Sequence, residues 1–124
     1  MDNISYVTKE LITKEKLEEI FKTAGLKYVL GGIEPYENFW VPDKKNKAIL
    51  VANINDINEK GESETEKEAL KEFEIIEVVL PANSHILDVE YSDYNILCLF
   101  EDAIKKIYSE VYYYDDKLNK FIEL

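Results

Sequence analysis

The segment from Thr13 to Gly25 carries the signals of a complete helix, from its first turn to its end. Thr13 is a favourable N-cap, and the apolar pair Ile12 and Leu17 is placed to form a hydrophobic staple across the first turn. Gly25 suits the left-handed position that follows a helix. Between these ends one apolar stripe recurs at helical spacing, at Leu17, Ile20, Phe21 and Ala24. The sequence therefore predicts a helix near the N-terminus with one buried side.

After this helix the apolar residues follow shorter spacings that indicate strands. Residues 27–30 are predicted as a short strand that Gly31 and Gly32 interrupt, and residues 38–41 and 48–54 as a hairpin around the turn at 43–46. The turn sequence returns near the C-terminus with one residue changed, as DKKNK at 43–47 and DKLNK at 116–120. Because residues 112–114 and 121–122 have strand-forming compositions, we expect a second hairpin there.

The segment 57–74 is the most polar part of the chain and predicts an exposed loop that leads into a short helix. Ser63 is placed as the N-cap of this helix, with Glu66 three residues on to complete a capping box. Residues 74–81 and 86–91 follow as predicted strands. In the second of these, Leu87, Val89 and Tyr91 alternate with Asp88 and Glu90, which indicates one buried and one solvated face.

Residues 96–100 are apolar throughout, and their pattern allows two interpretations. A continuous apolar run is typical of a central strand, which a short turn at 92–95 would join to the strand before it. The alternative is a long helix capped at Ser92, because apolar residues from Ile96 to Val111 also fit one helical face. We prefer the strand, with a helical turn confined to about 101–108.

These elements predict the fold class α+β, in a single domain over residues 1–124. We expect an N-terminal helix packed on a mainly antiparallel sheet built from hairpins, with one or two further short helices. A chain of 124 residues is the usual size of one domain with one core.

The charge balance restricts the partners of the chain. Fifteen lysines oppose 26 carboxylates, for a formal net charge of −11, and the sequence contains no arginine. Recognition of phosphate or guanine relies mostly on arginine, and a polyanion gains little from counterion release on another polyanion. We therefore expect no nucleic-acid binding, and we expect a basic protein partner on electrostatic grounds. With no signal sequence, no membrane-spanning apolar run and one cysteine, we expect no membrane association and a cytoplasmic location.

No catalytic or metal-binding pattern is found in the sequence. Cys98 and His85 are the only thiol and imidazole, and in the predicted hairpin they lie too far apart to form a nucleophile–base pair. We expect Cys98 to be a core residue and His85 a surface or turn residue. One cysteine and one histidine do not supply the usual zinc sets, and no EF-hand, P-loop or dinucleotide-binding motif occurs. The chain is therefore predicted to be non-enzymatic, with no cofactor and no metal.

Acidic and aromatic residues supply the candidates for a binding face. Tyrosine and tryptophan are favoured interface anchors, and carboxylates on a rigid face can stand in for phosphates. The candidate partner-binding residues are Tyr36, Trp40, Glu62, Glu64, Glu66, Glu68 and Tyr113. We expect an acidic binding protein that inhibits or neutralises a basic protein, of the immunity or phage counter-defence type. The alternatives are a protein that binds a small molecule or signalling nucleotide, and a structural or assembly protein of a mobile element, with homo-oligomerisation a further candidate.

Residues 75–100 resemble a pattern of small uncharacterised phage-encoded proteins. The matching stretches are IIEVVLPANSHILDV at 75–89 and ILCLF at 96–100, where Phe100 stands in place of the tryptophan of that pattern. The resemblance implies a strand that ends at a proline, a small turn, an Ile-Leu-x-Val segment and an apolar strand. It implies an origin in a mobile element and assigns no functional residue.

Overall fold

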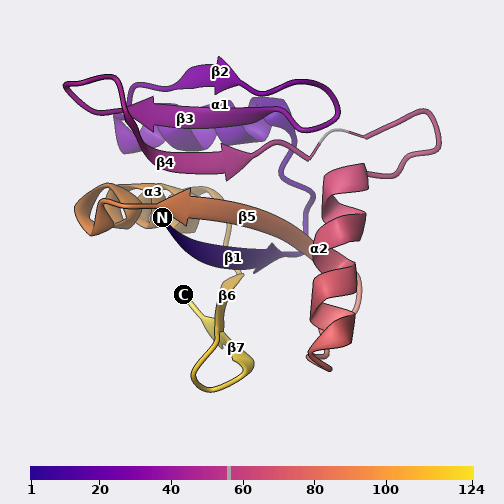
Figure 1. Cartoon of the computed structure of the whole chain (residues 1–124). Coiled ribbons are helices and arrows are strands. Elements are labelled where there is room, and N and C mark those ends of the chain that lie inside the picture. Colours follow the sequence, from indigo (N-terminus) through magenta and orange to yellow (C-terminus); the bar gives the residue numbers. More distant parts are fainter. Residues whose placement is uncertain (56) are drawn as a thin grey trace.

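The computed structural model describes residues 1–55 and 57–124. Within these residues the chain forms three helices and one seven-stranded antiparallel sheet, so the predicted α+β class is confirmed (Figure 1). The strands lie in the order β2-β3-β4-β5-β1-β6-β7. Along the chain the elements are β1 (Asp2–Thr8), α1 (Lys14–Ala24), β2 (Val29–Gly31), β3 (Asn38–Pro42), β4 (Ala48–Asn53), α2 (Glu64–Ile75), β5 (His85–Tyr91), α3 (Tyr94–Ile107), β6 (Val111–Asp115) and β7 (Lys120–Glu123).

The predicted N-terminal helix is α1, and both of its ends are confirmed. The Thr13 side chain accepts a hydrogen bond from the Lys16 amide, and Gly25 adopts the left-handed conformation with φ 70°. The Leu26 amide reaches back to the Phe21 carbonyl at 3.1 Å, which completes the helix end. The helix is not the first element of the chain, because strand β1 precedes it. Strand β1 pairs with both β5 and β6.

Both predicted hairpins form, and both turns use an asparagine with positive φ. Asn46 lies between β3 and β4 with φ 61°, and Asn119 lies between β6 and β7 with φ 50°. In the first turn Asp43 Oδ1 accepts from the amides of Lys45 and Lys47, each at 2.8 Å. Local hydrogen bonds of this kind explain why the turn sequence, together with the strand-forming residues on either side of it, located the hairpins.

Two strand predictions are wrong. Residues 96–100 belong to helix α3, as the long-helix alternative expected, but the N-cap is Asp93 and not Ser92. The helix also ends at Ile107, and Val111 begins strand β6. All five residues at 96–100 are apolar, but only one side of the helix is buried: Leu97 and Phe100 are buried, whereas Leu99 is exposed. Residues 74–81 form no strand either. Helix α2 continues to Ile75, and Glu77, with φ 59°, turns the chain away from it.

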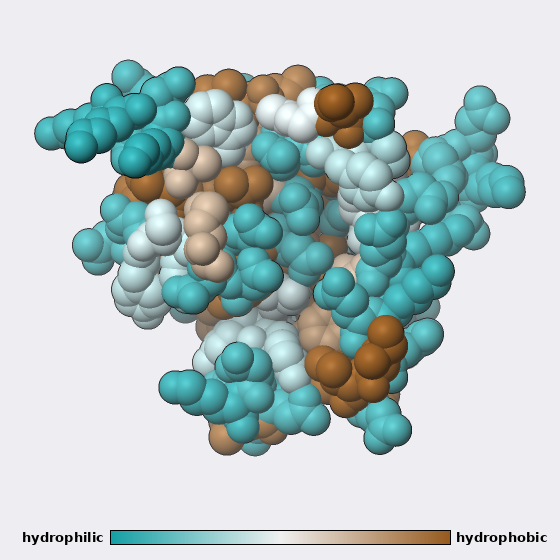
Figure 2. Space-filling view, in the orientation of Figure 1, coloured by the Kyte–Doolittle hydropathy of each residue, from teal (hydrophilic) through white to brown (hydrophobic). Residues whose placement is uncertain are grey.

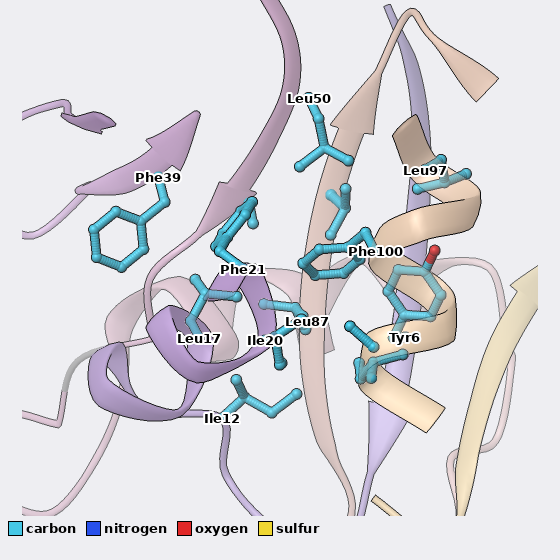
Figure 3. Close-up of a cluster of buried hydrophobic side chains, with 14 of the residues drawn as sticks. Tyr6, Ile12, Leu17, Ile20, Phe21, Phe39, Leu50, Leu87, Leu97 and Phe100 are labelled. Carbon is cyan, nitrogen blue, oxygen red and sulfur yellow. The ribbon is translucent and has the colours of Figure 1, made fainter. Parts of the chain in front are cut away.

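The helices divide unequally between the two faces of the sheet. Helices α1 and α3 cover one face, where Tyr6, Phe21 and Phe100 are fully buried (Figure 3). We call this the two-helix face. Helix α2 lies over only part of the other face, where a smaller buried cluster forms from Val7, Ala69, Phe73 and Ile86. We call this the α2 face. The candidate site lies beside α2, on the part of this face that the helix leaves uncovered.

Candidate functional site

A groove of about 490 Å³ lies on the α2 face, between helix α2 and the middle of the sheet. Its floor comes from β1, β4 and β5, one wall comes from α2, and the loop between β2 and β3 closes one end. Figure 2 shows hydrophilic side chains in the recessed centre of this face, beside α2. The polar and charged lining residues are Asn3, Ser5, Tyr36, Glu37, Asn53, Thr65, Glu68, Glu72, Asp88, Glu90 and Tyr114.

The antiparallel register brings the floor residues together from distant parts of the sequence. Ser5 pairs with Asp88, and Asn3 pairs with Glu90, across strands β1 and β5. In β5 the residues Leu87 and Val89 are buried, whereas Asp88 and Glu90 alternate with them and therefore lie on the opposite side. The solvated face predicted for this strand is thus the floor of the groove.

Carboxylates dominate the electrostatics of the groove. Its lining includes five of them, at Glu37, Glu68, Glu72, Asp88 and Glu90, and no lysine is among its described lining residues. Asp88 is partly buried at the floor of the groove. Burial raises the pKa of its carboxyl, the charges of Glu72 and Glu90 raise it further, and a hydrogen bond from Ser5 Oγ at 2.6 Å acts in the opposite direction. A cation entering the groove would relieve this repulsion and favour the ionised form of Asp88.

The β2–β3 loop closes the groove through Tyr36, whose hydroxyl donates to Glu68 Oε1 at 2.8 Å. This hydrogen bond to a carboxylate raises the pKa of Tyr36. The loop begins at Gly32, which has φ 78°, and a Cβ there would lie 2.3 Å from the Tyr36 carbonyl oxygen. A residue without a side chain is therefore needed for the loop to bring Tyr36 to α2.

Helix α2 is fastened to the sheet at both ends. At its N-terminal end the Glu66 carboxylate accepts from the Ile86 amide at 3.3 Å and lies 3.0 Å from His85 Nδ1. The Ser63 side chain accepts from the Glu66 amide, as a capping residue should. Near its C-terminal end Phe73 packs against Tyr114 and Phe121, with ring centroids 5.1 and 5.3 Å away. These contacts hold the helical wall of the groove in place.

The predicted binding residues are distributed over three regions of the structure. Tyr36 and Glu68 meet in the groove, and Trp40 lies on the same face of the sheet, opposite Val29 on one side and Val51 on the other. The structure does not bring the other four candidates to the groove.

Glu62 pairs with Lys67, and Glu64 accepts from Asn58, both near the start of α2. Glu66 anchors α2 to the sheet through the Ile86 amide and beside His85. Tyr113 lies on the two-helix face, where it pairs with Tyr6 and packs against the main core. Its neighbour Tyr114 lines the groove instead.

Sequence reasoning missed Ser5, Glu37, Glu72, Asp88 and Glu90 as groove residues. The alternation in β5 contained a signal for Asp88 and Glu90, but the pairing with β1 was needed to place them.

Cys98 lies on a helix and not on the predicted strand, whereas His85 lies at the start of a strand, as expected. Cys98 is partly buried on α3, and His85 is the first residue of β5, partly buried beside Glu66. Across residues 1–55 and 57–124, no group of three or more histidine, cysteine, aspartate or glutamate side chains is arranged to hold a metal ion. In the same part of the chain, none of the helices combines the length and the apolar character needed to cross a membrane.

Comparisons with known proteins add no relative: no protein-family model matches the chain, and neither a curated protein nor a solved structure matches it. The resemblance of residues 75–100 to phage-encoded proteins stays a prediction. Of the elements it implied, the segment before Pro81 is not a strand, and residues 96–100 are helical.

Proposed function

We propose that this protein is a non-enzymatic acidic binding protein that holds a basic protein partner in the groove on the α2 face. The observation that carries the proposal is the lining of that groove, with five carboxylates and no lysine among its described residues. The net charge of −11 would attract such a partner from a distance, and the groove would fix where its cationic side chains bind.

The groove suits an amino-acid cation for two reasons. Asp88 is partly desolvated and hydrogen-bonded to Ser5, so its carboxylate is held in one orientation and is poorly hydrated. Ion pairs and charge-assisted hydrogen bonds strengthen in such surroundings, and an arginine can bind a carboxylate through two parallel bonds. Glu72 and Glu90 lie close enough to Asp88 to raise its pKa, so a bound cation would interact with several carboxylates together.

A nucleotide or another anion is a poorer ligand for this groove, because lysines would have to neutralise it. We therefore favour a protein partner, and we propose that binding inhibits or neutralises it, with carboxylates in the places of nucleic-acid phosphates. This role fits an immunity or phage counter-defence protein that acts in the cytoplasm.

The test uses a fluorescent oligolysine peptide and two variants with equal net charge. The groove variant is Glu72→Gln with Glu90→Gln, and the control is Glu19→Gln with Asp102→Asn on the two-helix face. All four positions are exposed, so both variants should fold. Fluorescence anisotropy at several salt concentrations should show a loss of affinity of about tenfold or more in the groove variant and little loss in the control. Equal losses in both variants would mean general charge attraction and would refute a groove-specific role.

The natural partner can be sought with the same pair of variants. Affinity capture from the native host, followed by mass spectrometry, should recover a basic protein with the wild-type chain and the control variant. Recovery should fall with the groove variant. A protein recovered equally by all three chains would bind elsewhere on the surface.

A further inference from the structure

An apolar patch lies at the C-terminal end of helix α2, immediately beside the groove. It consists of Ile75, Ile76 and Val79, whose exposed fractions are 80%, 45% and 88%. Figure 2 shows a strongly hydrophobic group of atoms where Figure 1 places the lower end of α2. Single exposed apolar residues are common, but neighbouring β-branched aliphatic residues exposed to this degree mark a surface used for contact.

The backbone holds this patch in a defined position. Helix α2 ends at Ile75, and the chain turns at Glu77, which has φ 59°. The turn is closed by hydrogen bonds from the Glu77 amide to the Glu74 carbonyl and from the Val78 amide to the Phe73 carbonyl, each at 3.1 Å. The patch is therefore presented by a helix end whose last buried residue, Phe73, is fixed in the core of the α2 face.

The patch and the groove are continuous. Ile76 lines the groove together with Glu72 and Phe73, so a ligand that leaves the groove along α2 reaches the patch directly. Carboxylates flank the patch as well, at Glu72, Glu74 and Glu77, and the last turn of α2 contains no basic residue. The negative end of the helix dipole adds to this charge.

The negative charge around the patch indicates which kind of molecule binds there. A second copy of the chain would bring another −11 charges to an acidic surface, and an anionic membrane would be repelled in the same way. A segment that combines cationic and apolar side chains satisfies both parts of the surface. We infer that the patch of Ile75, Ile76 and Val79 binds apolar side chains of the partner's own basic segment, whose lysines or arginines enter the groove. This inference rests on the proposed function and specifies its partner as amphipathic.

Two fluorescent peptides of equal length and equal positive charge test the inference. One alternates lysine with alanine, and the other replaces several alanines with leucine. We expect wild-type protein to bind the leucine peptide about tenfold more tightly than the alanine peptide, because the patch buries the added apolar surface. The variant Ile75→Ser with Val79→Ser should lose this gain and still bind the alanine peptide normally. Leu118→Ser, at another exposed apolar residue, is the matched control and should keep the gain.

The outcomes separate the two proposals. If the alanine peptide binds in the groove but leucine adds no affinity, or adds the same affinity in the patch variant, the patch inference fails and the proposed function stands. If neither peptide depends on Glu72 and Glu90, the proposed function fails. Light scattering and vesicle flotation test the other occupants. A dimer, or binding to phosphatidylglycerol vesicles, that disappears in the Ile75→Ser/Val79→Ser variant would overturn the inference in favour of a second copy or a membrane.

Discussion

The two faces of the sheet use the same strands for different purposes. On the two-helix face, α1 and α3 bury a continuous core, in which the Phe21 and Phe100 ring centroids lie 5.4 Å apart. On the α2 face a single helix buries a small cluster and leaves carboxylates around an open groove. Strand β5 contributes to both, with Leu87 and Val89 on one side and Asp88 and Glu90 on the other. One face can therefore supply most of the stability while the other stays available for binding.

The largest expected difference between the faces concerns their aromatic cores. Phe100→Ala removes a fully buried ring that contacts both Tyr6 and Phe21, and it should lower the free energy of unfolding by about 3–5 kcal/mol. Phe73→Ala, on the α2 face, should cost about 2 kcal/mol, because the groove beside it lets neighbouring side chains and water relax into the space. Urea denaturation measures both values. A larger loss for Phe73→Ala would mean that the α2 face carries the stability.

A smaller effect is expected where the loop closes the groove. Gly32 and Gly61 both have positive φ, 78° and 75°, so alanine should cost about 1 kcal/mol at either position from the backbone alone. At Gly32 the new Cβ would also clash with the Tyr36 carbonyl, whereas at Gly61 nothing lies within 4 Å. We expect Gly32→Ala to cost about 2–3 kcal/mol and to weaken oligolysine binding, with Gly61→Ala as its matched control. Thermal unfolding and anisotropy would measure the two effects, and equal costs would show that the loop adapts without strain.

Local signals in the sequence predicted the elements whose stability is local. Helix α1 has a cap at each end, and the two hairpins have turns held by nearby aspartate and asparagine residues. The prediction of secondary structure failed where tertiary packing determines which element forms. Residues 96–100 have the composition of a strand, yet they lie in a helix that Asp93 caps. Only one side of this helix packs against the core. No local signal identified β1, although it lies between β5 and β6 in the sheet.

The groove was less predictable than the fold for the same reason. Tyr36 and Glu68 were found because an aromatic residue and an acidic helix are visible in the sequence. Asp88 was not found, because its role depends on Ser5, which is 83 residues away and reaches it only through the β1–β5 register. The acidic composition led us to expect a basic partner, but it did not indicate which of the 26 carboxylates gather at one place.

The smallest expected effect concerns Asp88, and it shows whether a residue of the α2 face lowers the stability of the fold while it favours binding. Burial raises the pKa of Asp88 in the folded protein, so the folded state binds a proton there more readily than the unfolded state. The ionised carboxylate therefore opposes folding once the pH exceeds its raised folded pKa, and this penalty is absent below the ordinary pKa of an aspartate. Asp88→Asn should raise the melting temperature at neutral pH, and its advantage should shrink as the pH falls through that range.

Ser5→Ala supplies the opposing variant, because it removes the hydrogen bond that favours the ionised form of Asp88. It should lower the melting temperature at neutral pH and have less effect at acid pH. Asp88→Asn should at the same time weaken oligolysine binding, since the peptide loses a carboxylate partner. Greater stability with weaker binding is the pattern expected of a residue retained for function. If Asp88→Asn proved less stable at neutral pH, the bond from Ser5 would outweigh burial, and Asp88 would belong with the structural residues of the sheet.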